Sequence, residues 1–197
     1  MITYEQHIYE FFATEDNFRN MYKIAENYPM IKKQLLEDFW ALVKKNIEIL
    51  NERHGSKWII QLTGGIELDR SKLILFKKGW AYEKGLPIVA IAFQRMGLAN
   101  WPYYGMFLNN DILRYDHDAI RKYAQGLTVA KAYSTNEDNQ WWPFWRNAGI
   151  DFSKPEEFTR ILPATRNALA DNFAETLFQL ATDMETDMEV MANKMKK

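Results

Sequence analysis

Residues 58–108 read WIIQLTGGIELDRSKLILFKKGWAYEKGLPIVAIAFQRMGLANWPYYGMFL, and four apolar runs separated by turn residues fill this stretch. Glycine or Asn-Asn-Asp turns follow the runs, which span 58–62, 72–77, 87–93 and 103–108. Short apolar runs bounded in this way are typical of β-strands. Such short connections favour antiparallel pairing, because parallel strands need long crossovers. The stretch therefore predicts an antiparallel meander of four or five strands, with residues 129–134 as a fifth, edge strand.

The residues before the meander, 1–55, have a helical pattern. A short amphipathic segment comes first, Thr14 or Asp16 is placed to cap a second helix, and Pro29 suits the first turn of a third. The apolar residues of the third helix recur in steps of four and three, so they form one stripe. Gly55 is the expected residue at its C-terminal end. The stripe consists of Leu36, Trp40, Val43, Ile47 and Leu50.

The residues after the meander are expected to form an aromatic loop region, 136–162, and a terminal helix, 163–197. Apolar side chains recur in steps of three and four along the terminal segment, which predicts one long helix packed on the sheet. Residues 1–197 are thus predicted to form one α+β domain, with 1–55 helical and 56–135 mainly in strands. The stripe of the terminal helix consists of Leu169, Phe173, Leu177, Leu180, Met184, Met188, Met191 and Met195.

Composition narrows the range of functions. The chain has 197 residues, of which 25 are basic and 26 acidic, and a formal net charge of −1. Nucleic-acid binding is not favoured, because such proteins usually carry a basic excess that displaces counterions. The absence of cysteine excludes disulfides, thiolate metal sites and cysteine nucleophiles. The polar N-terminal segment and the lack of an apolar run of about 20 residues predict a cytoplasmic protein without a membrane span.

The sequence contains no motif for common catalytic chemistry. It has neither the phosphate-binding loop of nucleotide hydrolases nor a Gly-x-Gly-x-x-Gly fingerprint. Hard metal ligands gather only at Asp111, Asp116, His117 and Asp118, where an N-cap followed by acids in a first helical turn is the simpler explanation. No catalytic residue, metal ligand or cofactor is therefore predicted, and a role other than catalysis is favoured.

Aromatic residues are the strongest functional signal, because they make up 15% of the chain and crowd two segments. Tyr and Trp suit interfaces, since they bury a large area with few rotatable bonds. Neighbouring arginines would add cation–π contacts. For the Trp-rich segment, residues 141–145, a hydrophobic plug between one end of the sheet and the last helix is the favoured structural interpretation, and the binding surface is the functional one. The candidate binding residues are Trp101, Tyr103, Tyr104, Arg114, Trp141, Trp142, Trp145 and Arg146.

The methionine-rich end of the terminal helix has two interpretations. Methionine is adaptable, so this end either packs on the body of the protein or meets a partner. A homodimer that pairs through the terminal helix, or through the third helix of the N-terminal part, is accordingly one prediction.

Several short segments occur in a recognisable order before the final helix: Phe39-Trp40, Trp58-Ile59-Ile60, Leu73-Ile74-Leu75-Phe76, Tyr104-Gly105-Met106 and a region from Trp141 to Phe158. In this order the chain resembles, over roughly residues 36–190, the C-terminal half of phage-type hypothetical proteins grouped with the PD-(D/E)XK nuclease superfamily. The resemblance implies a recognition role in a phage or mobile-element setting.

The catalytic signature of that superfamily is not present. It requires an acid two positions before a lysine, and no acid in this chain has that spacing. Asp69 and Lys72 are three apart and would face opposite sides of a strand. The preferred function is a non-catalytic interaction protein that binds an unknown protein partner through its aromatic surface. The alternatives are a degenerate nuclease using Glu67, Asp69 and Lys72, and a small-molecule sensor with an aromatic pocket.

Overall fold

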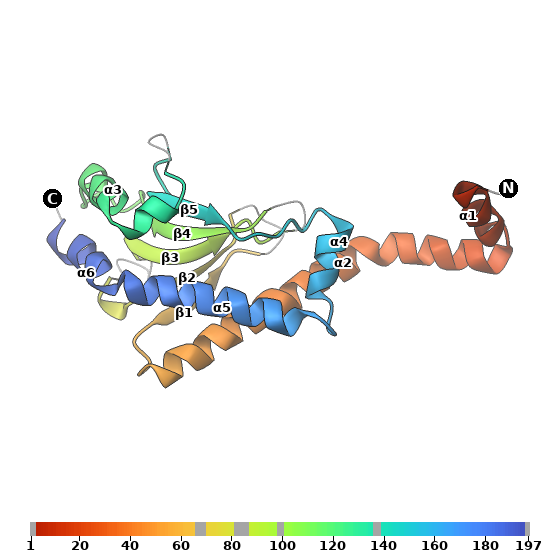
Figure 1. The fold of residues 1–197 in the computed structure, drawn as a ribbon, viewed down its shortest axis with the longest axis horizontal. Helices are drawn as coiled ribbons and strands as arrows, with labels where there is room; N and C mark the ends of the chain where they lie inside the picture. Colours follow the sequence, from red (N-terminus) through yellow and green to blue (C-terminus); the bar gives the residue numbers. More distant parts are fainter. Residues whose placement is uncertain (1–2, 66–69, 81–86, 98–100, 136–138, 196–197) are drawn as a thin grey trace.

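The computed structural model describes residues 3–65, 70–80, 87–97, 101–135 and 139–195. It has an α+β fold, in which helices cover one face of a five-stranded antiparallel sheet (Figure 1). The strands follow one another in space in the order β1-β2-β3-β4-β5, so the predicted meander is confirmed. Their bounds are β1 Ile59–Thr63, β2 Lys72–Phe76, β3 Val89–Gln94, β4 Tyr103–Leu108 and β5 Phe144–Asn147.

The N-terminal part is helical, as predicted, but Pro29 does not begin a third helix. Helix α1, Tyr4–Phe12, is followed by a single 39-residue helix α2, Glu15–Arg53, which has Thr14 as its N-cap and contains Pro29. Proline removes one backbone donor, and here the helical hydrogen bonds on either side of it hold the helix together. Gly55 follows the C-cap with φ +86°, the left-handed conformation that commonly ends helices.

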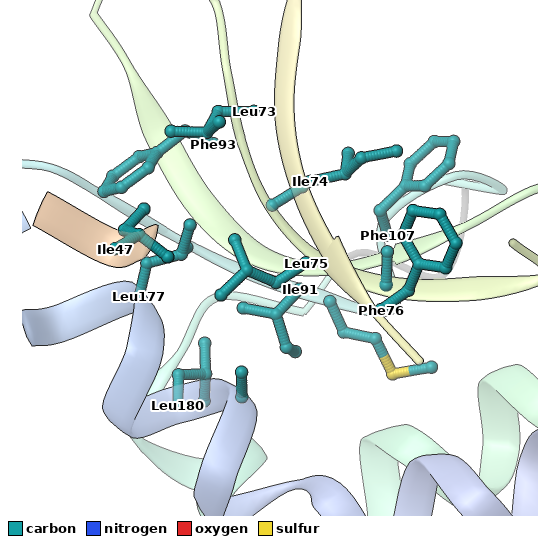
Figure 2. Packing of buried hydrophobic residues seen from close by; sticks show 14 of the residues in the cluster. Ile47, Leu73, Ile74, Leu75, Phe76, Ile91, Phe93, Phe107, Leu177 and Leu180 are labelled. Carbon is teal, nitrogen blue, oxygen red and sulfur yellow. The ribbon is translucent and has the colours of Figure 1, made fainter. Parts of the chain in front are cut away.

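The core lies between the sheet and two long helices, the second half of α2 and α5, Arg166–Asp183. Phe93 of β3 stacks on Phe173 of α5, with ring centroids 5.1 Å apart, and the Trp40 indole donates a 3.0 Å hydrogen bond to the Met96 carbonyl. Figure 2 shows Leu75 and Ile91 on the side of Leu177 and Leu180, with Ile74 and Phe107 across the strands from them. Alternation along each strand therefore separates a helix-covered face from a second face.

The fifth strand was wrongly predicted at residues 129–134. That segment forms the 3-10 helix η3, Val129–Ala132, and only Ser134 makes an isolated bridge, to Trp145. The strand that completes the sheet is β5, inside the expected aromatic loop region. It pairs closely with β4 because Gly105, the register partner of Trp145, has no Cβ atom, and a Cβ atom there would clash with the Phe144 carbonyl. A local propensity argument misses this, since the cause is a close approach between distant segments.

The terminal segment was predicted as one helix but forms two. Helix α5 ends at Asp183 with Met184 as its C-cap, and α6 spans Glu185–Lys194. The stripe nevertheless continues, because Met184, Met188 and Met191 are all buried within the chain. Lys77 pairs with Glu185 at 2.5 Å and thereby joins α6 to the body. Dimerisation through this helix stays a prediction.

No helix within the described residues combines the length and the apolar content needed to cross a membrane.

Candidate functional site

A cleft of about 540 Å³ lies on the face of the sheet opposite α2 and α5. Its floor is a row of side chains on adjacent strands: Thr63 lies opposite Lys72, Lys72 opposite Gln94, and Gln94 opposite Tyr103. Phe93 points at α5, so its neighbour Gln94 points to the other face. We call this hollow the sheet-face cleft. Its lining consists of Thr63, Arg70, Lys72, Ile74, Pro87, Gln94, Tyr103, Phe107, Asn109, Asp111, Asn139, Trp141 and Trp142.

Two tryptophans from the segment before β5 form the aromatic wall of the sheet-face cleft. Trp141 stacks on Phe107, with centroids 6.0 Å apart and an interplanar angle of 13°. Trp142 meets Tyr103 edge to face at 4.8 Å. The side-chain oxygen of Asn139 accepts the backbone N–H groups of both tryptophans, at 3.1 and 3.2 Å, and so fixes the turn that presents them. The wall is therefore held in place by local hydrogen bonding as well as by packing.

Lys72 places a partly compensated positive charge on the floor of the cleft. Burial lowers the pKa of Lys72, the nearby positive charge of Arg70 lowers it further, and Asp111 opposes both effects. The Nζ atom lies 4.8 Å from the centroid of the Phe107 ring, a cation–π distance. Because Asp111 does not cancel the other two effects, the ammonium group is poised to gain from an additional anion.

Tyr103 contributes a neutral hydroxyl to the same row. Burial raises the pKa of Tyr103 to about 12, although the positive charge of Arg95 opposes the shift. The Arg95 guanidinium lies 6.0 Å from the centroid of the Tyr103 ring. Arg95 has φ +58°, an uncommon left-handed conformation for a residue other than glycine, of the kind that tends to cluster at binding and active sites.

The predicted aromatic surface is divided between the two faces of the sheet. Tyr103, Trp141 and Trp142 line the sheet-face cleft. Tyr104 lies on the helix-covered face beside Phe93, at 5.5 Å, and a smaller hollow there is lined by Tyr104 and Arg146. Alternation along β4 explains the division, because Tyr103 and Tyr104 are adjacent.

The remaining candidates lie outside the lining of the cleft. Trp101 is 57% exposed, Trp145 is half-buried with its ring 5.4 Å from Tyr103, and the Arg114 guanidinium is 5.7 Å from the Tyr115 ring. Trp141 is 38% exposed, whereas Trp142 is only 2% exposed. Trp142 is buried against Gln94, Tyr103 and Phe107 on the sheet face opposite α5, and not against the last helix as the plug interpretation expected.

The sequence argument missed Arg70, Gln94 and Phe107, and it considered Lys72 only for a nuclease centre. The sequence did contain one signal for these residues. Lys72 begins β2 and Gln94 ends β3, two strands that are otherwise apolar, and a polar residue in that position can mark a binding site. Their convergence depends on the strand register, which the sequence does not state. Glu67 and Asp69, the other two residues of the proposed nuclease centre, lie outside the described residues.

The acidic cluster around Asp116 has a structural explanation. The Asp116 side chain accepts the Ala119 N–H at 3.0 Å and caps helix α3, His117–Gly126, and Asp118 pairs with Arg121 at 3.1 Å. Across the part of the chain that the structure describes, no three His, Asp or Glu side chains are grouped as metal ligands would be.

Comparison with protein-family models, with curated proteins and with solved structures found no match to this chain.

Proposed function

We propose that this protein is a non-catalytic binding protein whose sheet-face cleft takes a small ligand with a flat apolar body and an anionic group. The observation that carries the proposal is the row of Lys72, Gln94 and Tyr103 beneath the Trp141 and Trp142 wall. A cation, an amide and a neutral phenol provide polar contacts of different kinds along one line.

The size of the cleft favours a small molecule over a protein surface. Its volume of about 540 Å³ lies within the range of roughly 300–1,000 Å³ typical of small-molecule sites. Such sites are usually mostly apolar with a few placed polar groups. This lining joins an aromatic wall to a majority of polar and charged side chains, which suits a ligand that is itself partly polar. This form of the proposal retains the binding role predicted from the sequence and joins it to the aromatic pocket of the sensor alternative.

The charge of the cleft favours an anion. Among the described residues, Arg70 and Lys72 line it together with a single acid, Asp111. An anion beside Lys72 would offset the effect of burial on its ammonium group, and a charge-assisted hydrogen bond is stronger than a neutral one. Trp141 is 38% exposed, and its exposed part would pack against the flat body of a ligand.

A pair of fluorescent dyes tests the proposal. Anilinonaphthalene sulfonate is a flat anion, and phenylnaphthylamine is the same molecule without the sulfonate. We expect the anionic dye to bind more tightly to the wild-type protein, and Lys72→Met to weaken its binding about tenfold or more while leaving the neutral dye little changed.

The controls use tryptophans inside and outside the cleft. Trp141→Ala is expected to weaken binding of both dyes, because it removes the stacking surface. Trp101→Ala is the matched control, since Trp101 is exposed but does not line the cleft. Equal affinity of the wild type for the two dyes, unchanged by Lys72→Met, would overturn the proposal.

A further inference from the structure

The first part of the chain forms an arm that projects from the rest of the molecule (Figure 1). We call α1 together with residues 15–33 of α2 the N-terminal arm. Helix α1 has no buried residue, and the first buried residue of α2 is Leu36. The arm is therefore a pair of helices that contributes nothing to the buried core of the body.

Large apolar side chains are concentrated on the N-terminal arm. Of 17 such side chains that are exposed among the described residues, ten lie on it. Six are aromatic and half or more exposed, and at about 150–250 Å² for each ring they present roughly 600–900 Å² to solvent. A standard protein interface buries about 800 Å² on each partner. The ten are Tyr4, Ile8, Tyr9, Phe11, Phe18, Tyr22, Ile24, Tyr28, Met30 and Ile31.

The apolar stripe of the arm continues the stripe that α2 buries in the body. Ile24, Tyr28, Ile31 and Leu35 recur in steps of four, three and four, and Leu35 already packs against the core. Within the body, Phe39 on the same helix contacts Phe173 of α5, with ring centroids 5.7 Å apart. The same helix face is thus covered by another helix in the body and uncovered along the arm.

The charges of the arm select a second copy of this chain, in antiparallel orientation, as the helix that covers it. The outer half, residues 3–20, contains four acids and one arginine, whereas the inner half, residues 21–33, contains three lysines and one acid. An antiparallel pair places the acidic half of each arm along the basic half of the other. A parallel pair would place like charges side by side, which is unfavourable.

We propose that two copies of the protein form a two-fold symmetric dimer through antiparallel pairing of their N-terminal arms. With Ile24 and Ala25 at the two-fold axis, Phe18 of each arm meets Ile31 of the other, and Met21 meets Tyr28. Phe18, Met21, Ile24, Tyr28 and Ile31 then each have an apolar counterpart, and the same pairs form on both sides of the axis, as in an isologous interface. The dimer is independent of ligand binding in the sheet-face cleft.

A membrane surface is the runner-up occupant, and the composition of the arm disfavours it. Amphipathic helices that lie on membranes usually carry many Lys and Arg residues on their polar face. Residues 3–33 contain five acids and four bases. This arrangement fits a partner with matching charges of both signs better than an anionic lipid surface.

Disulfide crosslinking tests the pairing cleanly, because the 197-residue chain has no cysteine that could form other crosslinks. Ala25→Cys lies at the proposed two-fold axis, so mild oxidation is expected to convert most of the full-length protein to covalent dimer. Glu26→Cys is the matched control one residue away. It lies on the helix face turned away from the stripe of Phe18, Ile24 and Ile31 and is expected to stay monomeric under the same conditions.

Two further sets of variants test the antiparallel orientation of the arms and the contribution of their apolar residues to dimerisation. Phe18→Cys is expected to crosslink efficiently with Ile31→Cys when the two proteins are mixed, and poorly alone. The exposed stripe substitutions Ile24→Glu and Tyr28→Glu should convert the dimer to monomer in sedimentation velocity with unchanged helical circular dichroism. Leu113→Glu, an exposed apolar site away from the arm, should leave the dimer intact.

Three results would overturn the proposal. The first is a wild type that stays monomeric up to high micromolar concentration. The second is Phe18→Cys that crosslinks as efficiently alone as it does when mixed with Ile31→Cys. The third is a dimer that survives both Ile24→Glu and Tyr28→Glu. A monomer that binds vesicles of phosphatidylcholine and phosphatidylglycerol, and loses that binding with Ile24→Glu, would assign the arm to membranes instead.

Discussion

The indole N–H of Trp142 donates a hydrogen bond of 2.9 Å to the side-chain oxygen of Gln94. This contact joins the segment before β5 to the centre of the sheet, 48 positions away in sequence. It therefore couples the wall of the sheet-face cleft to its floor. Stability measurements and ligand binding can both report on it.

Gln94→Leu is expected to lower the free energy of unfolding by about 1–3 kcal/mol, because it leaves the indole donor of a 2% exposed tryptophan without its acceptor. Trp142→Phe removes the donor, so the double variant should be more stable than the sum of the two single changes by about 1 kcal/mol. Urea unfolding of the four proteins measures the coupling. If the changes in unfolding free energy of the two single variants added up to that of the double variant, the hydrogen bond would contribute nothing to stability.

Lys72→Met is expected to maintain or raise stability at neutral pH, while it weakens binding of the anionic dye. Burial lowers the pKa of Lys72 below its ordinary 10.5, so the folded state bears a cost whenever this lysine is charged. That cost is present below the folded-state pKa and disappears as the pH rises toward 10.5.

The stability advantage of Lys72→Met over the wild type should therefore shrink between pH 7 and the alkaline range. Urea unfolding of both proteins at several pH values measures the difference. An advantage that grows with pH, or a large loss of stability at pH 7, would contradict the assignment of Lys72 as a poorly compensated cation.

Tyrosine ionisation should reveal the environment of the cleft. Burial raises the pKa values of Tyr103 and Tyr133 to about 12, so these two of the ten tyrosines should ionise last in an ultraviolet titration. A raised folded-state pKa stabilises the fold below the ordinary value of 10.0, and this stabilisation is lost as the pH rises from there toward 12. Tyr103→Phe should remove one late transition and make alkaline unfolding less steep. A titration in which all tyrosines ionise together near pH 10 would refute the burial of Tyr103.

Gly105→Ala is expected to destabilise the protein by about 1–3 kcal/mol or more, because the added Cβ would meet the Phe144 carbonyl and lie 2.7 Å from the Trp145 Cα. Since β5 follows the tryptophan wall directly, the same change should weaken dye binding in the cleft. Gly79→Ala is the control, as its Cβ would meet nothing within 4 Å. Thermal unfolding of both variants measures the difference, and equal melting temperatures would show that β5 pairs elsewhere.

The sequence was informative where the signal is local. It predicted β4 at 103–108 and the antiparallel order of the first four strands. Apolar runs and the turn residues between them specify strands and hairpins through contacts within a few positions of the chain. It was wrong at Pro29, where helix α2 continues through the proline. It was also wrong at residues 129–134, because the fifth strand is β5, whose close approach to Gly105 is a contact between distant segments.

The candidate site could be predicted only in part. Tyr103, Trp141 and Trp142 were identified from their residue types, but their association with Lys72 and Gln94 follows from register and from the turn fixed by Asn139. By itself, the sequence determined the first four strands, the helical character of both ends of the chain, the absence of cysteine chemistry and the wealth of aromatic residues. Only the tertiary structure decided which face of each strand the helices cover, which tryptophan stays exposed and which stretch of α2 lacks a neighbour, because these depend on contacts between segments far apart in the chain.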